Sequence, residues 1–153
     1  AKPRAFREAP DPSFADYAAG IVANAQALAQ ALAAQGFRLV SGGTDNHLLL
    51  VDLRPFNADL TGKVAQASLD AAGITLNKNT VPDDPRSPFV TSGVRIGTPA
   101  VTTQGMGPAE MPEIAELIAA VLSKPDDAAV HAEVAERTAK LCARFPVYPD
   151  AVG

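Results

Sequence analysis

The sequence has few of the residues that mark several large protein classes. Its one cysteine, Cys142, excludes an internal disulfide and agrees with a reducing compartment, so a cytoplasmic location is expected. No apolar run approaches the length of a membrane-spanning helix, so no membrane association is expected. Lysine and arginine total 13 against 17 acidic residues, a net charge of −4, and they form no basic stripe. This balance argues against a nucleic-acid partner.

Residues that carry catalytic chemistry are also scarce. Asp45 and His47 could supply two metal ligands, but no third ligand follows at a suitable spacing, so no metal site is predicted. Ser87, Ser92 and Cys142 have no histidine nearby in the sequence that could activate them as nucleophiles. The residues by themselves therefore predict no catalytic group.

The chain does contain the helix and strand patterns of one domain. Residues 1–11 are polar and contain proline, and they are interpreted as a lead-in from an upstream segment; residues 12–153 are interpreted as one domain. The predicted fold is an α+β sandwich, a small, mostly antiparallel sheet covered by helices, in the order α-β-β-α-β-β-α-α. Helices are expected over about residues 13–35, 61–72, 112–123 and from 126 onward. Strands are expected over residues 37–41, 47–53, 74–76 and around Arg95, with a long loop over residues 77–90.

Three local patterns make this prediction more specific. Ser13 followed by Asp16 resembles a capping box at the start of the first long helix. The glycine-rich turn over residues 42–46 predicts an antiparallel hairpin between the first two strands. Residues 48–51 are apolar without alternation, which is typical of a strand that is covered on both faces.

The most informative run places Arg95 in a short strand with a glycine two residues away on each side. Strand side chains alternate, so Gly93, Arg95 and Gly97 share one face, while Val94 and Ile96 anchor the other face in a core. The glycines are expected to clear space around the guanidinium. Its planar fork suits a small carboxylate, which can accept two parallel hydrogen bonds. The alternative, an arginine that reaches water from an edge strand, fits this pattern equally well.

Three motifs then occur in order: SGGTDNH over residues 41–47, NKNTVP over residues 77–82 and SPFVTSGVRIGTPA over residues 87–100. Together they closely resemble the C-terminal region of serine hydroxymethyltransferase, over about residues 36–105. Three motifs in the family's order are a specific signal. The resemblance implies the small C-terminal domain of a fold-type I enzyme that depends on pyridoxal phosphate. Such enzymes interconvert serine plus tetrahydrofolate with glycine plus 5,10-methylenetetrahydrofolate.

The resemblance also implies roles for single residues. Arg95 would bind the substrate α-carboxylate, Asn79 would hydrogen-bond the pteridine ring of folate, and Ser87 would contribute to the same folate site. From the residues alone, Asn79 is better explained as an asparagine that holds a left-handed turn. Lys78 is interpreted as part of a loop, because the family's cofactor lysine follows an upstream threonine-rich tract. No residue of this chain is expected to bind pyridoxal phosphate, so the chain alone is expected to be inactive.

The resemblance further implies a missing large domain and a homodimer, or a tetramer, of the full-length enzyme. The chain departs from the family at Thr103 and Gln104, where many bacterial relatives carry one or two arginines. A second cation near the substrate or the folate tail is then absent or supplied from elsewhere. A hypothesis from another class is a free-standing α+β module that binds a small carboxylate without catalysis.

Overall fold

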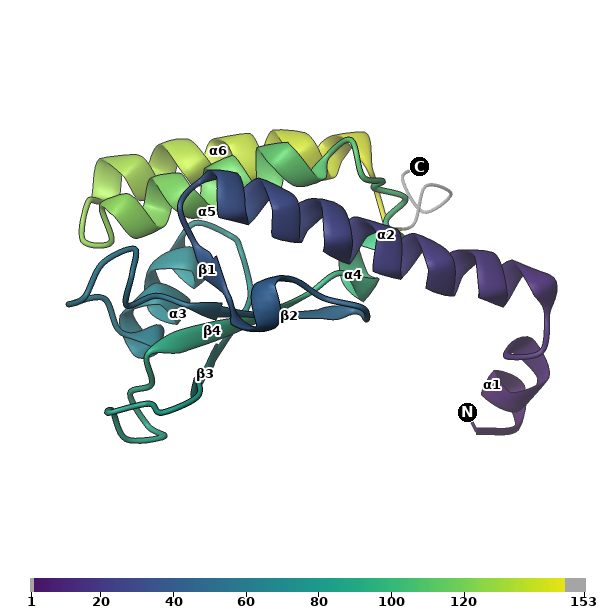
Figure 1. Cartoon of the computed structure of the whole chain (residues 1–153). Coiled ribbons are helices and arrows are strands. Elements are labelled where there is room, and N and C mark those ends of the chain that lie inside the picture. Colours follow the sequence, from purple (N-terminus) through teal and green to yellow (C-terminus); the bar gives the residue numbers. More distant parts are fainter. Residues whose placement is uncertain (1, 148–153) are drawn as a thin grey trace.

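The protein has two layers, a four-stranded antiparallel sheet and a set of helices that covers one of its faces (Figure 1). The computed structural model describes residues 2–147. The strand order is β1-β2-β4-β3, so the predicted α+β sandwich with a small antiparallel sheet is confirmed. No helix in this range is long and apolar enough to cross a bilayer. The elements are α1 (Lys2–Glu8), α2 (Pro12–Ala34), β1 (Arg38–Leu39), the short 3₁₀ helix η1 (Val40–Gly42), β2 (Leu48–Asp52), α3 (Gly62–Ala71), β3 (Asn77–Asn79), β4 (Gly93–Gly97), α4 (Pro99–Thr103), α5 (Met111–Ser123) and α6 (Ala128–Arg144).

The register of the sheet decides which side chains share a face. Arg95 on β4 lies opposite Leu50 on β2 and opposite Asn77 on β3. Directly paired residues of antiparallel strands point to the same side. The neighbouring residues Val94 and Ile96 therefore point to the other side, where they are buried under the helices. The sheet thus has one face in the core and one face, with Arg95, that the described helices leave uncovered.

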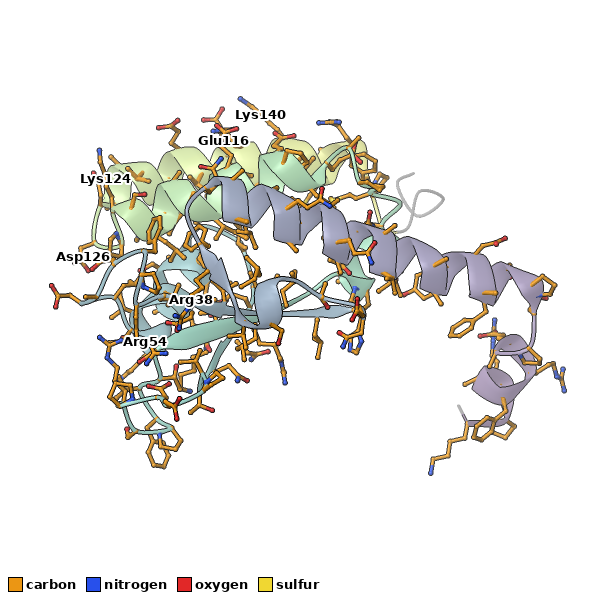
Figure 2. The ribbon with its side chains drawn as sticks, in the orientation of Figure 1. Arg38, Arg54, Glu116, Lys124, Asp126 and Lys140 are labelled. Atoms are coloured by element: carbon orange, nitrogen blue, oxygen red, sulfur yellow. The ribbon has the colours of Figure 1, made fainter. Side chains whose placement is uncertain are left out.

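The core lies between the sheet and the helical layer. The second half of α2 and most of α5 contribute buried apolar side chains to one hydrophobic core with the strands, and α6 covers α5 from outside (Figure 1). The first half of α2 extends beyond the sheet, and α1 lies at its N-terminal end. Phe6 of α1 and Phe14 of α2 are exposed. Glu116 and Lys140 project from the outer side of the helical layer, whereas Arg38 and Arg54 lie at the sheet (Figure 2).

The start of α2 differs from the prediction. Asp11, not Ser13, is the N-cap, and its carboxylate accepts a hydrogen bond from the backbone N–H of Ser13 at 2.9 Å. Pro12 occupies the first turn, where its fixed φ suits a helix and its missing N–H costs nothing. The sequence-based interpretation also missed α1, and it missed α4, whose Thr103 hydroxyl lies 2.8 Å from the Tyr17 hydroxyl on α2.

The predicted strand over residues 74–76 is wrong, because the strand lies one segment later, at β3. Its residues are polar, since this edge strand presents Asn77 and Asn79 to the uncovered face. The backbone N–H of Lys78 points away from the sheet and donates to Oε1 of Gln66 on α3 at 2.9 Å. The polar composition of residues 77–79 predicts a loop, but their hydrogen-bonded pairing with β4 makes them a strand.

The expectation that β2 is covered on both faces is also wrong for the described part of the chain. Leu49 and Val51 are each only 1% exposed, but Leu48 and Leu50 on the opposite face are half-buried. The apolar run therefore has one side in the core of this domain and one side beside Arg95. The leucines at positions 48 and 50 thus lie on the face of the sheet that no described helix covers.

Candidate functional site

The side chain of Arg95 lies on the uncovered face, at the centre of the sheet. β4 is bonded to β2 on one side and to β3 on the other, so the edge-strand interpretation of this arginine is wrong. The side chain is exposed, and none of the ion pairs among residues 2–147 includes it. An exposed guanidinium on a strand that is held from both sides is well placed to receive a carboxylate.

Arg95 and Asn79 line the same cleft, which has a volume of about 740 Å³. The cleft extends over the uncovered face from the loop that joins β1 to β2, across β2, to Arg95 on β4 and Asn79 on β3. The structure thus places both predicted residues at one cleft, and their roles stay predictions. The other lining residues are Leu48, Leu49 and Leu50 of β2 and the loop residues Val40, Ser41, Gly42, Gly43, Thr44, Asp45 and Asn46.

The loop of residues 40–46 forms one wall of this cleft. Thr44 Oγ1 donates to the carbonyl of Leu48 at 2.6 Å, and Asn46 Oδ1 accepts from the backbone N–H of Leu48 at 2.8 Å. Ser41 has φ 65°, a left-handed conformation that is uncommon outside glycine. The sequence indicated a turn here, but nothing in it predicted that the turn would face Arg95.

Asn79 ends β3 in an extended conformation, with Gly93 as its partner on β4. It is absent from the residues with positive φ, so the left-handed-turn interpretation is wrong. Its Nδ2 donates to the carbonyl of Thr80 at 2.7 Å, which orients the amide. The half-buried side chain keeps a carbonyl oxygen and an amide hydrogen that can pair with the edge of a heterocycle.

Ser87 lies apart from the other two predicted residues. Its side chain is exposed and is not part of the cleft lining. Its carbonyl accepts hydrogen bonds from the backbone N–H groups of Val90 at 3.0 Å and Thr91 at 2.9 Å, which form a turn beside the exposed Phe89. The described structure therefore brings Arg95 and Asn79 together but leaves Ser87 outside their cleft.

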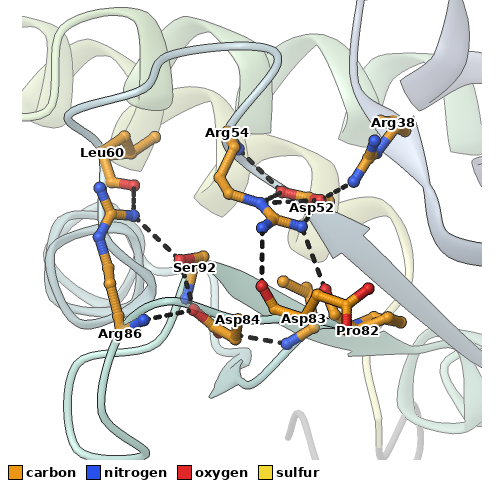
Figure 3. Close-up of polar contacts among 10 residues, drawn as sticks. Arg38, Asp52, Arg54, Leu60, Pro82, Asp83, Asp84, Arg86 and Ser92 are labelled. Atoms are coloured by element: carbon orange, nitrogen blue, oxygen red, sulfur yellow. Dashed lines mark hydrogen bonds and ion pairs between the residues drawn. The ribbon is translucent and has the colours of Figure 1, made fainter.

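The loop between β3 and β4 is held by Asp84 (Figure 3). One carboxylate oxygen of Asp84 accepts hydrogen bonds from the backbone N–H groups of Val81 and Ser92. The other oxygen accepts from the backbone N–H of Arg86 and from the Ser92 hydroxyl. The two ends of the loop are thereby joined to one carboxylate. Burial by itself would raise the pKa of Asp84, but the hydrogen bonds from Ser92, Arg86 and Val81 outweigh it and lower the pKa to about 2.

A second ionic group connects this loop to the end of β2. Asp52 is fully buried and accepts hydrogen bonds from both Arg38 and Arg54. Arg54 also donates to the carbonyls of Pro82 at 3.3 Å and Asp83 at 3.2 Å (Figure 3). Burial alone would raise the pKa of Asp52, but the hydrogen bonds from the two arginines outweigh it and keep that pKa below its usual value. The sequence did not reveal the contact of Arg38 with Asp52 or those of Arg54 with the loop, because they join segments that are 14 to 29 residues apart.

The cleft does not contain the group that an aldehyde cofactor needs. No lysine is among its lining residues. Lys78 lies directly opposite the buried Val94, so it points to the helical side of the sheet, beside Lys63 and Gln66 of α3. Lys78 is part of β3, so its interpretation as a loop residue is wrong. The lining of this cleft therefore does not fit pyridoxal phosphate by itself.

We expect Asp84→Asn to lower the free energy of unfolding by roughly 1–3 kcal/mol near neutral pH, because an amide NH₂ would replace one acceptor oxygen. The folded-state pKa lies below the ordinary value of 3.8. The stabilisation is thus complete above about pH 5 and is lost as the pH falls through about 2. Urea unfolding at several pH values, with hydrogen exchange at the amides of Val81 and Ser92, measures the effect.

Asp83→Asn is the matched control, because it makes the same charge change one residue away. No side-chain hydrogen bond of Asp83 occurs among the described residues, and asparagine tolerates its φ of 53°. Its unfolding free energy should change by less than about 0.5 kcal/mol. Equal losses in the two variants would contradict the role of Asp84.

Comparison with known proteins gives the family directly. The family model described as serine hydroxymethyltransferase matches residues 1–118. A serine hydroxymethyltransferase of Nitrosococcus oceani is 53% identical over 148 residues, and one of a Cyanothece species is 55% identical over 149 residues. Each alignment covers 97% of this chain but only 35% and 34% of the relative, so the chain spans about a third of their length. Neither relative supports a free-standing carboxylate-binding module. The chain belongs to the serine hydroxymethyltransferase family.

Proposed function

We propose that the chain is the C-terminal part of a serine hydroxymethyltransferase, which interconverts serine plus tetrahydrofolate with glycine plus 5,10-methylenetetrahydrofolate. The observation that carries the proposal is the exposed Arg95 in one cleft with Asn79. The guanidinium would donate two parallel N–H hydrogen bonds to the α-carboxylate of serine or glycine. Because β4 is held from both sides, the bound amino acid would keep one orientation.

Asn79 is proposed to bind the pteridine ring of folate. Its amide offers a donor and an acceptor on the same side of the sheet as Arg95, at the end of the strand that runs beside it. Ser87 is proposed to take part in the same folate site from the neighbouring loop. Its exposed position outside the cleft means that its contacts would be to a more distant part of folate.

The cofactor and the remaining partners are proposed from the family. Pyridoxal phosphate would be held by residues outside this chain and would supply the electron sink for chemistry at the α-carbon. The upstream large domain and a second subunit are expected to cover apolar surface such as Phe6 and Phe14, which are 76% and 46% exposed. A homodimer, or a tetramer built from it, is the proposed assembly. The cytoplasmic location expected from the single cysteine stays a prediction.

Asn79→Ala in the full-length enzyme tests the folate part of the proposal. We expect the KM for tetrahydrofolate to rise about tenfold while the KM for serine changes less than about twofold, because the lost hydrogen bonds go to the ring. Steady-state kinetics with each substrate varied in turn measures both values.

Asn57→Ala is the matched control for this test. Asn57 is also half-buried, and it also makes one local side-chain hydrogen bond, to the backbone N–H of Asp59 at 3.0 Å, but it does not line the cleft. Its KM values should match those of the wild type. An unchanged folate KM in Asn79→Ala would refute the proposed role.

A further inference from the structure

Arg54 is the residue through which the end of β2 holds the loop after Asn79. Its Nε and one terminal nitrogen bind the buried carboxylate of Asp52, at 3.0 and 2.7 Å. Its terminal nitrogens also reach the carbonyls of Pro82 and Asp83, three and four residues after Asn79. Only a planar fork with five N–H donors can make all these contacts together.

The backbone that Arg54 holds includes a left-handed residue. Asp83 has φ 53°, a conformation that few residues other than glycine, asparagine and aspartate adopt. Its carbonyl is one of the two that Arg54 binds, so the guanidinium stabilises this conformation directly. Val81, which lies between Asn79 and this left-handed segment, is buried against Gly93. A change at Asp83 would therefore be transmitted to Asn79 over a short, packed segment.

Arg38 provides an internal comparison. It binds the same Asp52 carboxylate from β1, but no contact joins it to the loop in the described structure. Its side chain is 56% exposed, against 28% for Arg54. The two arginines thus share the task of neutralising Asp52, and only Arg54 adds a connection to the folate side of the cleft. Loss of either one leaves Asp52 paired with the other.

We propose that Arg54 is a positioning residue for folate, which sets the place of Asn79 and of the following loop through its bonds to Asp52 and to two loop carbonyls. This inference rests on the proposed function. It assigns no contact between Arg54 and substrate. The role depends on the shape of the guanidinium, so a lysine at the same position, with the same charge, should fail to fill it.

The experiment compares Arg54→Lys with Arg38→Lys in the full-length holoenzyme. Isothermal titration with glycine, and with tetrahydrofolate in the presence of glycine, gives two affinities for each protein. Arg54→Lys is expected to weaken tetrahydrofolate binding about tenfold and to change glycine binding less than about twofold, since lysine loses the two carbonyl bonds. Arg38→Lys is expected to leave both affinities within about twofold of the wild type.

Three results would overturn the inference: unchanged folate affinity in Arg54→Lys, equal weakening of glycine and folate, or the same folate loss in Arg38→Lys. Should Arg54→Lys not yield folded protein, Arg54→Gln gives the same test, because glutamine can reach at most one carbonyl, and the same folate-selective loss is expected. A wild-type protein that binds no tetrahydrofolate would instead refute the proposed function. The two failures are therefore distinguishable.

Discussion

Arg95→Ala is expected to abolish most of the activity of the full-length enzyme. The KM for serine should rise steeply and kcat should also fall, giving a loss of roughly 100- to 1000-fold in kcat/KM. The physical reason is that, in the proposed role, two charge-assisted hydrogen bonds would fix both the affinity for the carboxylate and the orientation of the amino acid. Steady-state kinetics with serine as the varied substrate, and titration with glycine, measure the two effects.

Arg95→Lys separates charge from shape in this prediction. Lysine keeps the positive charge between the same neighbours but offers one ammonium in place of a fork, so an intermediate loss is expected. The folate affinity of both variants, measured at saturating glycine, should change far less than the glycine affinity. Unchanged serine kinetics in Arg95→Ala would rule out the proposed role of this residue.

Gly93→Ala is expected to be the most destabilising small substitution on the uncovered face of the sheet, with a loss of about 3 kcal/mol in unfolding free energy. A Cβ at this position would overlap Val81 Cγ1 and would lie 2.6 Å from the carbonyl oxygen of Val51 and 3.1 Å from that of Asn79. Two of these neighbours are backbone atoms of the flanking strands, which cannot move without breaking the ladder. Urea unfolding, with hydrogen exchange at the β4 amides, measures the loss.

Gly97→Ala is the matched control on the same strand and the same face, two residues after Arg95. Its nearest atom would be Leu48 Cδ2 at 3.3 Å, the end of a half-buried side chain that can move. A cost below about 1 kcal/mol is expected. A similar cost at both glycines would show that close packing at Gly93 is not what constrains the strand.

The strand around Gly93 and Gly97 shows which structural features the sequence predicts and which it does not. The alternation around Arg95 correctly predicted which side chains enter the core, because period-two burial is a local property. The expectation that both glycines make room for the guanidinium is not supported. Gly93 is instead required by the neighbouring strands, and that contact depends on tertiary packing.

The same distinction applies to the candidate site. The resemblance of motifs selected Arg95 and Asn79, which the fold then brings to one cleft. It could not predict the wall over residues 40–46 or the contacts of Arg54 and Asp84. Those depend on backbone carbonyls and N–H groups, which every residue carries and no motif records.

The side chain of Gln66 at the outer edge of β3 has a consequence for how this domain meets other polypeptides. An open strand edge can recruit a strand from another chain through its free N–H and C=O groups. Here the outward N–H of Lys78 is already bonded to Gln66 Oε1. Strand addition at this edge would first have to break that hydrogen bond, so the side-chain amide of Gln66 disfavours edge-to-edge aggregation.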